Sequence, residues 1–245
     1  MRRVYALTVL VLLGCAAVAQ QDEKPEKLSV HTWVREDVFA GFMVNDMERF
    51  EKGVAKLERH LAKNPEAATA LAWLGGTELY RAVLAHEAGR GSETETRCKK
   101  AMELFARAYS ISPKDQGVLA TTGGSLVLFA DRLPPAQKAE GWKIAQARFT
   151  ELEAQQAPMV DKFPLHIRGE LLSGVAMSAQ RTGDEERAKT YLAKIVKDLP
   201  GTPYEARAKR WMEQPELASR SSLVCQTCHE PGRLENRLAA MQKQQ

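Results

Sequence analysis

The sequence predicts an all-α protein, on three observations. From Trp33 onward most residues are good helix formers, and apolar side chains return every three or four positions. The alternation of apolar and polar residues that marks a half-buried strand does not occur. Two glycines in apolar surroundings, Gly41 in "VFAGF" and Gly75 in "AWLGG", lie 34 residues apart. Such an interval is typical of chains that stack helical hairpins.

Residues 1–19 are expected to form a cleaved export signal. A short basic start precedes an apolar run, and the small residues Ala17 and Ala19 would allow cleavage before Gln20. The apolar run is shorter than the roughly 20 residues that a bilayer-spanning helix needs. We therefore expect a processed leader and no transmembrane helix.

A second interpretation of this segment stays open. "LLGC", which ends at Cys15, resembles a bacterial lipobox, in which the cysteine is lipidated and becomes the mature N-terminus. The protein would then be a lipoprotein, anchored by its lipid to a membrane that faces the periplasm. Under both interpretations the mature chain is exported, and a bacterial periplasm is the expected compartment.

Composition and charge narrow the classes of partner. The chain has 245 residues, of which 44% are hydrophobic and 27% charged, and these values are typical of one or two globular domains. Removing Arg2 and Arg3 with the leader lowers the formal net charge from +4 to +2. So weak a charge gives no reason to expect nucleic acid as a partner.

Three segments are expected after the leader. Residues 20–32, beginning "QQDEKPEKLS", are polar and predict a linker. Residues 33–214 carry the helical repeats, and a last helix that ends near Trp211 would cap them. Residues 215–245 form a short C-terminal tail, which we expect to stand outside the repeat array.

A recurring pattern predicts how the second helix of each hairpin packs. A small residue is followed by an apolar residue four positions later and by a proline twelve positions after the small residue. Small residues allow two helices to approach, the apolar residue fills the space between them, and proline starts the next turn, where a backbone N–H is dispensable. The three examples are Gly53, Leu57 and Pro65; Ala101, Phe105 and Pro113; and Ala188, Leu192 and Pro200.

These positions resemble the tetratricopeptide repeat family. The resemblance implies a right-handed α-solenoid of about four helix-turn-helix repeats, with Gly123 opening the third. It also implies a protein or peptide partner in the solenoid groove, and interaction instead of catalysis. The second unit departs from the family by about fourteen extra residues, which we place in an extended helix and a loop between His86 and Arg97.

The tail contains the segment "VCQTCHE", with Cys225, Cys228 and His229. This Cys-x-x-Cys-His pattern resembles the haem attachment site of c-type cytochromes. The resemblance implies one covalent haem c, two thioether bonds to its vinyl groups, and His229 as the proximal ligand of the iron. Such haem is attached outside the cytoplasm, which agrees with the export signal. An electron-transfer role with a redox protein as partner follows.

Other interpretations of Cys225 and Cys228 remain. The pair could form a disulfide, or could bind a metal, although a zinc site needs two further ligands and no second Cys/His pair has suitable spacing. The protein would then be a non-haem adaptor. A complete cytochrome domain also extends further, whereas sixteen residues follow His229 here.

The sixth ligand of such an iron is not identified by the sequence. Each candidate has a simpler interpretation as a packed or helix-end residue, and the methionines at 159, 177 and 212 are expected to fill the core. No motif for hydrolysis or group transfer occurs, so we do not expect an enzyme. The ligand candidates are His31, His60, His86, His166 and Met241.

Overall fold

The computed structural model describes residues 30–224, and the part of the chain so described is all-α, with no strand. Its helices form four antiparallel hairpins and one further helix. The first hairpin holds α1 (Val30–Val44) and α2 (Met47–Lys63), the second α3 (Ala68–Glu87) and α4 (Gly91–Ile111), the third α5 (Gln116–Phe129) and α6 (Pro135–Gln156), and the fourth α7 (Leu165–Thr182) and α8 (Glu185–Asp198), followed by α9 (Pro203–Glu213). Three short 3₁₀ helices are η1 (Ala130–Arg132), η2 (Ala157–Lys162) and η3 (Pro215–Ser219).

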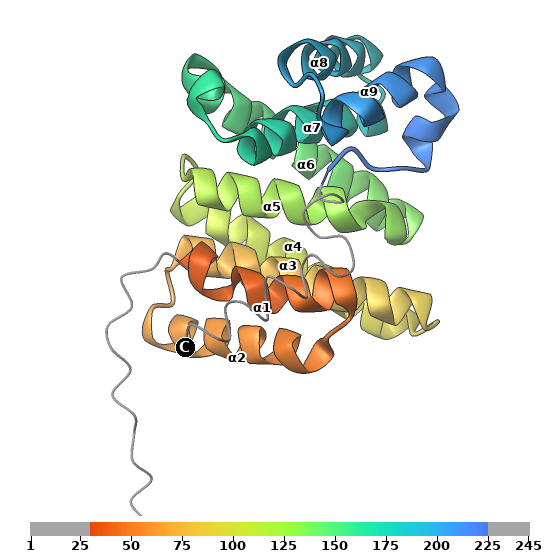
Figure 1. Ribbon diagram of the computed structural model, residues 1–245. Coiled ribbons are helices and arrows are strands. Elements are labelled where there is room, and N and C mark those ends of the chain that lie inside the picture. Colours follow the sequence, from red (N-terminus) through yellow and green to blue (C-terminus); the bar gives the residue numbers. More distant parts are fainter. Residues whose placement is uncertain (1–29, 225–245) are drawn as a thin grey trace, which may run out of the picture.

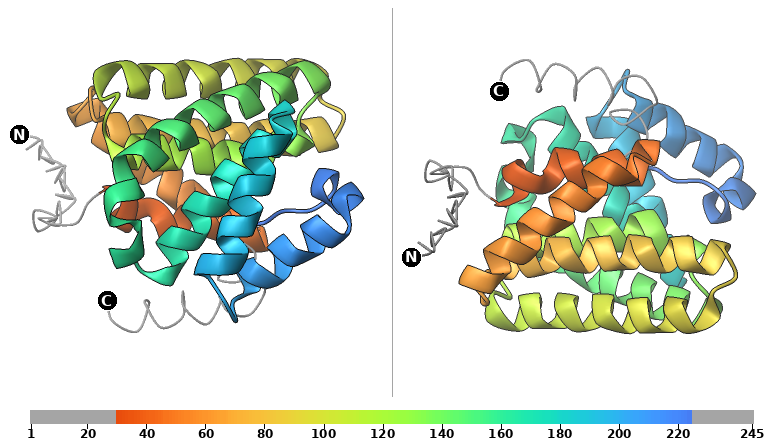
Figure 2. Two further views of the ribbon diagram at one scale, coloured as in Figure 1. Left: turned by 90° about the horizontal axis from the view of Figure 1, so that it is seen from above. Right: turned by 90° about the horizontal axis from the view of Figure 1, so that it is seen from below.

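The hairpins stack in chain order, from α1 and α2 at one end to α8 and α9 at the other (Figure 1). Seen along the stack, α1 and α2 cross α3 and α4 obliquely, so successive hairpins are rotated (Figure 2). The prediction of an all-α chain of about four helix-turn-helix units is confirmed. The right-handed sense of the solenoid stays a prediction.

Aspartates begin three of the helices. The side chains of Asp46, Asp115 and Asp184 precede α2, α5 and α8, and each accepts a hydrogen bond from the backbone N–H three residues later, at 2.9–3.2 Å. Such caps satisfy N–H groups that have no partner within the helix. Between α7 and α8, Gly183 adopts a φ of 85°, which ends α7 and allows the chain to reverse at once.

The repeating pattern of the second helices packs as expected. Its small and apolar members are all buried, whereas the prolines are exposed in the turns. Gly75 of α3 shows why small residues are needed where helices meet, since a Cβ there would lie 2.7 Å from the ring of Phe105 in α4. The buried members are Gly53, Leu57, Ala101, Phe105, Ala188 and Leu192.

The extra residues of the second unit lengthen both of its helices. We expected one extended helix and a loop between His86 and Arg97. Instead α3 has 20 residues and α4 has 21, and only residues 88–90 connect them. Gly89, with a φ of 72°, allows this tight reversal. The second hairpin is therefore longer than a regular repeat, and its loop is shorter than we expected.

The first helices of two hairpins are buried on all sides over much of their length. Every residue from Ala70 to Tyr80 in α3 and from Leu171 to Ala179 in α7 is buried. Tyr80 also donates a hydrogen bond from its hydroxyl to the carbonyl of Gly41 in α1, at 2.8 Å. Phe42 of α1 packs against one ring of its own helix and against rings of α2, α3 and α5. These two stretches of helix consequently provide no exposed lining for a peptide groove. The rings in contact with Phe42 are Phe39, Phe50, Tyr80 and Phe129.

The expectation that three methionines fill the core is correct for one of them. Met177 of α7 is 1% exposed, whereas Met159 and Met212 are 45% and 51% exposed. Met159 lies in η2 and Met212 lies near the end of α9, where their neighbours leave one side open. Helical spacing alone did not show which side of each segment faces the stack.

Over residues 30–224, no helix combines the length and the apolar character required to cross a bilayer.

Candidate functional site

The candidate haem-binding residues Cys225, Cys228 and His229 lie outside the described residues, and so do the leader at 1–19 and Cys15. The structure does describe the chain that leads to them. After α9 it passes through η3 and turns back over α7, ending at Val224 (Figure 1). We call residues 215–224 the C-terminal strap.

The C-terminal strap packs against the repeats. Leu223 and Val224 are 0% and 2% exposed, and Ala218 is also buried. Burying a side chain the size of valine or leucine contributes about 1.5–3 kcal/mol. We expected the whole tail to stand outside the repeat array, and this is wrong for residues 215–224. Leu223 and Val224 stand directly before a polar motif in the sequence. Their burial against the repeats is apparent only from the structure.

Hydrogen bonds from α7 and α9 fix the path of the strap. The indole Nε1 of Trp211 donates to Ser221 Oγ at 2.7 Å. The backbone N–H of Leu223 donates to the Sδ of Met177 at 3.2 Å, and Arg207 Nη1 donates to the carbonyl of Leu223 at 3.4 Å. Buried backbone groups of the strap therefore find partners on two helices, as buried polar groups require.

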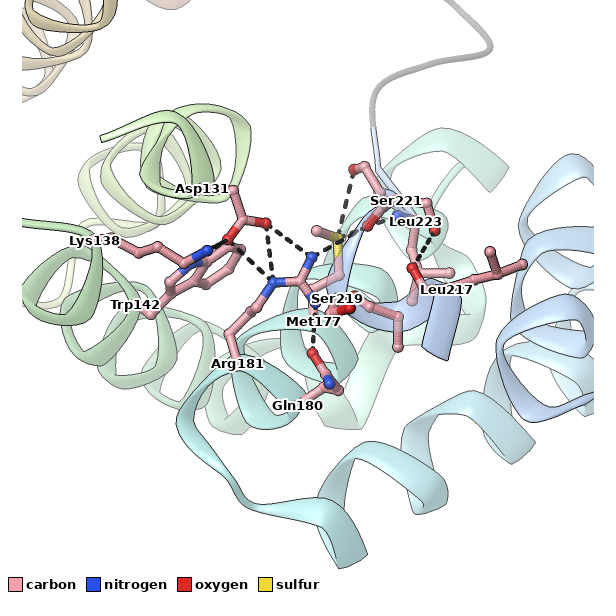
Figure 3. A network of polar contacts seen from close by, with 12 residues as sticks. Asp131, Lys138, Trp142, Met177, Gln180, Arg181, Leu217, Ser219, Ser221 and Leu223 are labelled. Atoms are coloured by element: carbon pink, nitrogen blue, oxygen red, sulfur yellow. Dashed lines mark hydrogen bonds and ion pairs between the residues drawn. The ribbon is translucent and has the colours of Figure 1, made fainter. Parts of the chain in front are cut away.

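Arg181, in the last turn of α7, binds both the strap and the third hairpin (Figure 3). Its Nη1 donates to the carbonyl of Ala218, and its Nη2 donates to the carbonyl of Ser221 at 3.3 Å. On the other side Nη2 and Nε donate to Asp131 Oδ2 of η1, at 2.8 and 2.9 Å. Only 6% of the arginine side chain is exposed. Arg181 thus joins three parts of the chain that are distant in sequence.

Two tryptophan rings complete the surroundings of Arg181. Its guanidinium carbon lies 5.4 Å from the centre of the Trp142 ring in α6 and 5.7 Å from that of Trp211 in α9. These distances are within the range of cation–π attraction, which is strengthened when water is excluded. The arginine is held by a carboxylate, two carbonyls and two aromatic rings.

Asp131 is the acidic centre of this network. Burial by itself would raise the pKa of its carboxyl group, but the hydrogen bonds from Arg181 and Lys138 outweigh burial and hold the pKa below the ordinary 3.8. Lys138 Nζ and Trp142 Nε1 approach Asp131 Oδ1 at 2.9 and 3.0 Å. The carboxylate is therefore ionised at neutral pH and accepts from three side chains.

Cys98 is the free cysteine within the described part of the chain, and it is buried in α4. Burial, with a smaller contribution from the negative charge of Glu140, raises the pKa of its thiol to about 11. Such a thiol is rarely ionised at neutral pH and is a poor nucleophile and metal ligand. It is not accessible for pairing with Cys225 or Cys228 while the repeats are folded.

The donor set of Cys225, Cys228 and His229 fits a covalent haem. It supplies two thiols at the spacing of an attachment site and an imidazole beside the second thiol. Val224, which is buried, is joined directly to Cys225 by a peptide bond. Between Val30 and Val224, no group of three or more His, Cys, Asp or Glu side chains could hold a metal ion.

The candidate distal ligands are not brought together. His60 is half-buried in α2, His86 is exposed at the end of α3, and His166 is exposed at the start of α7. These helices belong to the first, second and fourth hairpins. Met241 lies outside the described residues, as does the side chain of His31.

Fold and site together define an all-α protein of stacked helical hairpins, closed by a strap that leads into a Cys-x-x-Cys-His segment. Comparisons with protein-family models, with curated proteins and with solved structures give no significant match.

Proposed function

We propose that this protein is an exported helical scaffold that carries one covalent haem c on Cys225 and Cys228 and transfers electrons to or from a protein partner. His229 is the proximal ligand of the iron in this proposal. The protein acts by binding and positioning and is not an enzyme. The leader at residues 1–19, or lipidation at Cys15, places it in the periplasm or on a membrane facing that compartment.

The observation that carries the proposal is the anchoring of the strap. A haem on a long free linker would have no defined distance to a redox partner. Here the residues directly before Cys225 are buried, and Trp211, Met177 and Arg181 hold the strap by hydrogen bonds. The chain is consequently fixed on the repeat body as far as Val224, and in this proposal that fixed segment gives the adjoining haem a defined distance to a docked partner.

The residues of the motif would have separate roles. Each thiol would hold the group through a thioether, formed by addition of its S–H across one vinyl double bond with no leaving group. The imidazole of His229 would hold the iron through a ring nitrogen, for which it must be neutral. Haem, once bound, supplies one-electron chemistry at its iron.

The partner proposed is a redox protein that contacts the scaffold near the strap. A groove lined by α3 and α7 receives no support, because the central stretches of both helices are buried. Contacts near the strap would bring the partner close to the haem, and distance controls the rate of electron transfer. Nucleic acid is not part of the proposal.

The proposal is tested by producing the full-length precursor with a cytochrome c maturation system and purifying the mature protein. We expect a red protein whose haem stays attached in denaturing electrophoresis, and whose intact mass includes one haem. The mass also distinguishes a start at Gln20 from a lipidated Cys15. The double variant Cys225→Ser, Cys228→Ser is the control and should be colourless.

A colourless wild-type protein with unmodified Cys225 and Cys228 would overturn the proposal. A mass lower by two hydrogens would point to a disulfide, and metal that is retained through gel filtration would point to a metal site. Either result would favour the non-haem adaptor instead.

A further inference from the structure

We infer that Arg181 is a positioning residue that fastens the haem-bearing end of the chain to the repeat body. The inference rests on the proposed function as far as haem is concerned, but the fastening itself can be measured without haem. The contacts of Arg181 that bear on this end of the chain are with Ala218 and Ser221 of the strap. It acts through the strap.

The geometry supports this role because Arg181 contacts the strap at two separate points. The carbonyls of Ala218 and Ser221 lie on either side of the turn that follows η3, and the guanidinium donates to both (Figure 3). Ser221 is itself held by Trp211, so one end of the turn is bound by α7 and α9 together. Loss of the arginine would remove the donors from the α7 side and leave those from α9.

Asp131 also binds the guanidinium. This ion pair keeps Arg181 in place if the strap moves. Two nitrogens of Arg181 bond Asp131 Oδ2, at 2.8 and 2.9 Å. Because Lys138 and Trp142 also hold this carboxylate, the anchor belongs to the third hairpin. The strap is therefore tied through Arg181 to a part of the fold that precedes it by more than 80 residues.

Only arginine offers donors in the required directions. Its planar guanidinium presents five N–H groups in a rigid fork, whereas a lysine presents one compact charge. A lysine at 181 could keep the ion pair with Asp131 but could not reach both carbonyls and the carboxylate at once. Arg181→Lys should therefore preserve the ion pair between α7 and η1 and still loosen the strap.

The first experiment measures hydrogen–deuterium exchange in the full chain produced without the maturation system, and so without haem. Wild type, Arg181→Met and Arg181→Lys are compared. We expect amide exchange in residues 215–224 to accelerate at least about tenfold in Arg181→Met, since the hydrogen bonds to a charged group each contribute more than the roughly 1.4 kcal/mol equivalent to that factor. Arg181→Lys should give a smaller increase, with α6 and α7 unchanged.

The matched control is Arg132→Met. Arg132 lies beside Asp131 in η1, but its exposed guanidinium pairs with Glu87 at 2.8 and 2.9 Å and has no contact with the strap that the structure records. This variant should leave strap exchange at the wild-type rate. The inference is overturned if both Arg181 variants exchange at the wild-type rate in residues 215–224, or if Arg132→Met accelerates the strap equally.

The second experiment applies to the haem-loaded protein. In this proposal the strap keeps the haem against the repeat body, so that a loosened strap would admit water to it, and water stabilises the ferric state with its additional charge. We expect Arg181→Met to lower the midpoint potential, Arg181→Lys to recover part of the difference, and Arg132→Met to match wild type. Equal potentials in all four proteins would show that Arg181 does not position the haem. Failure of the proposed function gives a different result, namely a colourless protein in which strap exchange still depends on Arg181.

Discussion

Gly174 of α7 lies directly against the ring of Phe149 in α6, so closely that a Cβ on Gly174 would come within 2.2 Å of the ring. A Cβ on Gly123 of α5 would come within 3.0 Å of the same ring. Phe149 thus fills a space that exists because both neighbours are glycines. Phe149 of α6 therefore contacts both α5, its partner in the third hairpin, and α7 of the fourth hairpin.

We expect Gly174→Ala to destabilise the protein by about 1–3 kcal/mol, because the ring of Phe149 must move within a closely packed interior. Gly124→Ala is the matched control, since a Cβ there meets nothing within 4 Å and alanine is favoured in a helix by about 0.5–1 kcal/mol. Urea unfolding followed by circular dichroism measures both variants. A Gly174→Ala protein as stable as Gly124→Ala would contradict the proposed packing.

Glu78 should be the most important single acidic residue for stability. Its side chain is fully buried in α3, and it pairs with Arg97 at 2.8 Å, Lys100 at 3.0 Å and Arg81 at 3.2 Å. We expect Glu78→Gln to cost about 2–3 kcal/mol, below the value for a fully buried pair because the cations are partly exposed and can be hydrated. In contrast, the side chain of Glu93 is 39% exposed, so Glu93→Gln should not change the unfolding midpoint measurably.

The pKa of Glu78 predicts how the free energy of unfolding depends on pH. Burial would raise the pKa of the Glu78 carboxyl, but hydrogen bonds from Arg97 and Lys100 outweigh it, and the pKa lies below the ordinary 4.5. Glu78 therefore binds protons more readily in the unfolded chain than in the folded one. Its stabilisation is complete above pH 4.5 and is lost as the pH falls through the folded pKa. The difference in unfolding free energy between wild type and Glu78→Gln should be constant above that pH and shrink below it; a difference that grows on acidification would refute this assignment.

Cys98 should be unreactive in the folded protein. With a pKa of about 11, only about one thiol in a thousand is ionised at pH 8, and burial in α4 blocks access to it. In the variant Cys225→Ser, Cys228→Ser, iodoacetamide should leave Cys98 unlabelled at pH 8 until urea unfolds the chain, as measured by mass spectrometry. Rapid labelling without denaturant would show that α4 opens readily.

Much of the fold could be predicted from residue patterns because the forces involved are local. Helix spacing and the recurring small residue and proline of the second helices act within one hairpin. The sequence predicted one extended helix and a loop for the extra residues of the second unit, whereas α3 and α4 share them. That division depends on how far each helix can extend along its neighbour, which the residues from 86 to 97 do not determine by themselves.

The sequence could not show that Met177 is buried whereas Met159 and Met212 are exposed. All three occur at helical spacing, but exposure depends on which helix covers which face. The aspartate at 131 and the arginine at 181 are likewise ordinary surface residue types in isolation. Nothing in their local sequence shows that they would meet across 50 positions of chain.

The sequence by itself determined that the chain is helical, that its helices pair in a repeating order, and that two thiols and an imidazole lie together near its end. These properties depend on residue type and short spacing, and no long-range contact is needed to state them. Only the tertiary structure shows that the residues directly before Cys225 pack against the repeats. Leu223 and Val224 are buried, and Arg181 binds the strap, because α7, α9 and the turn at Asp131 lie close together beside the strap. Such convergence is a property of stacked hairpins, whose contacts join residues that are distant in the chain.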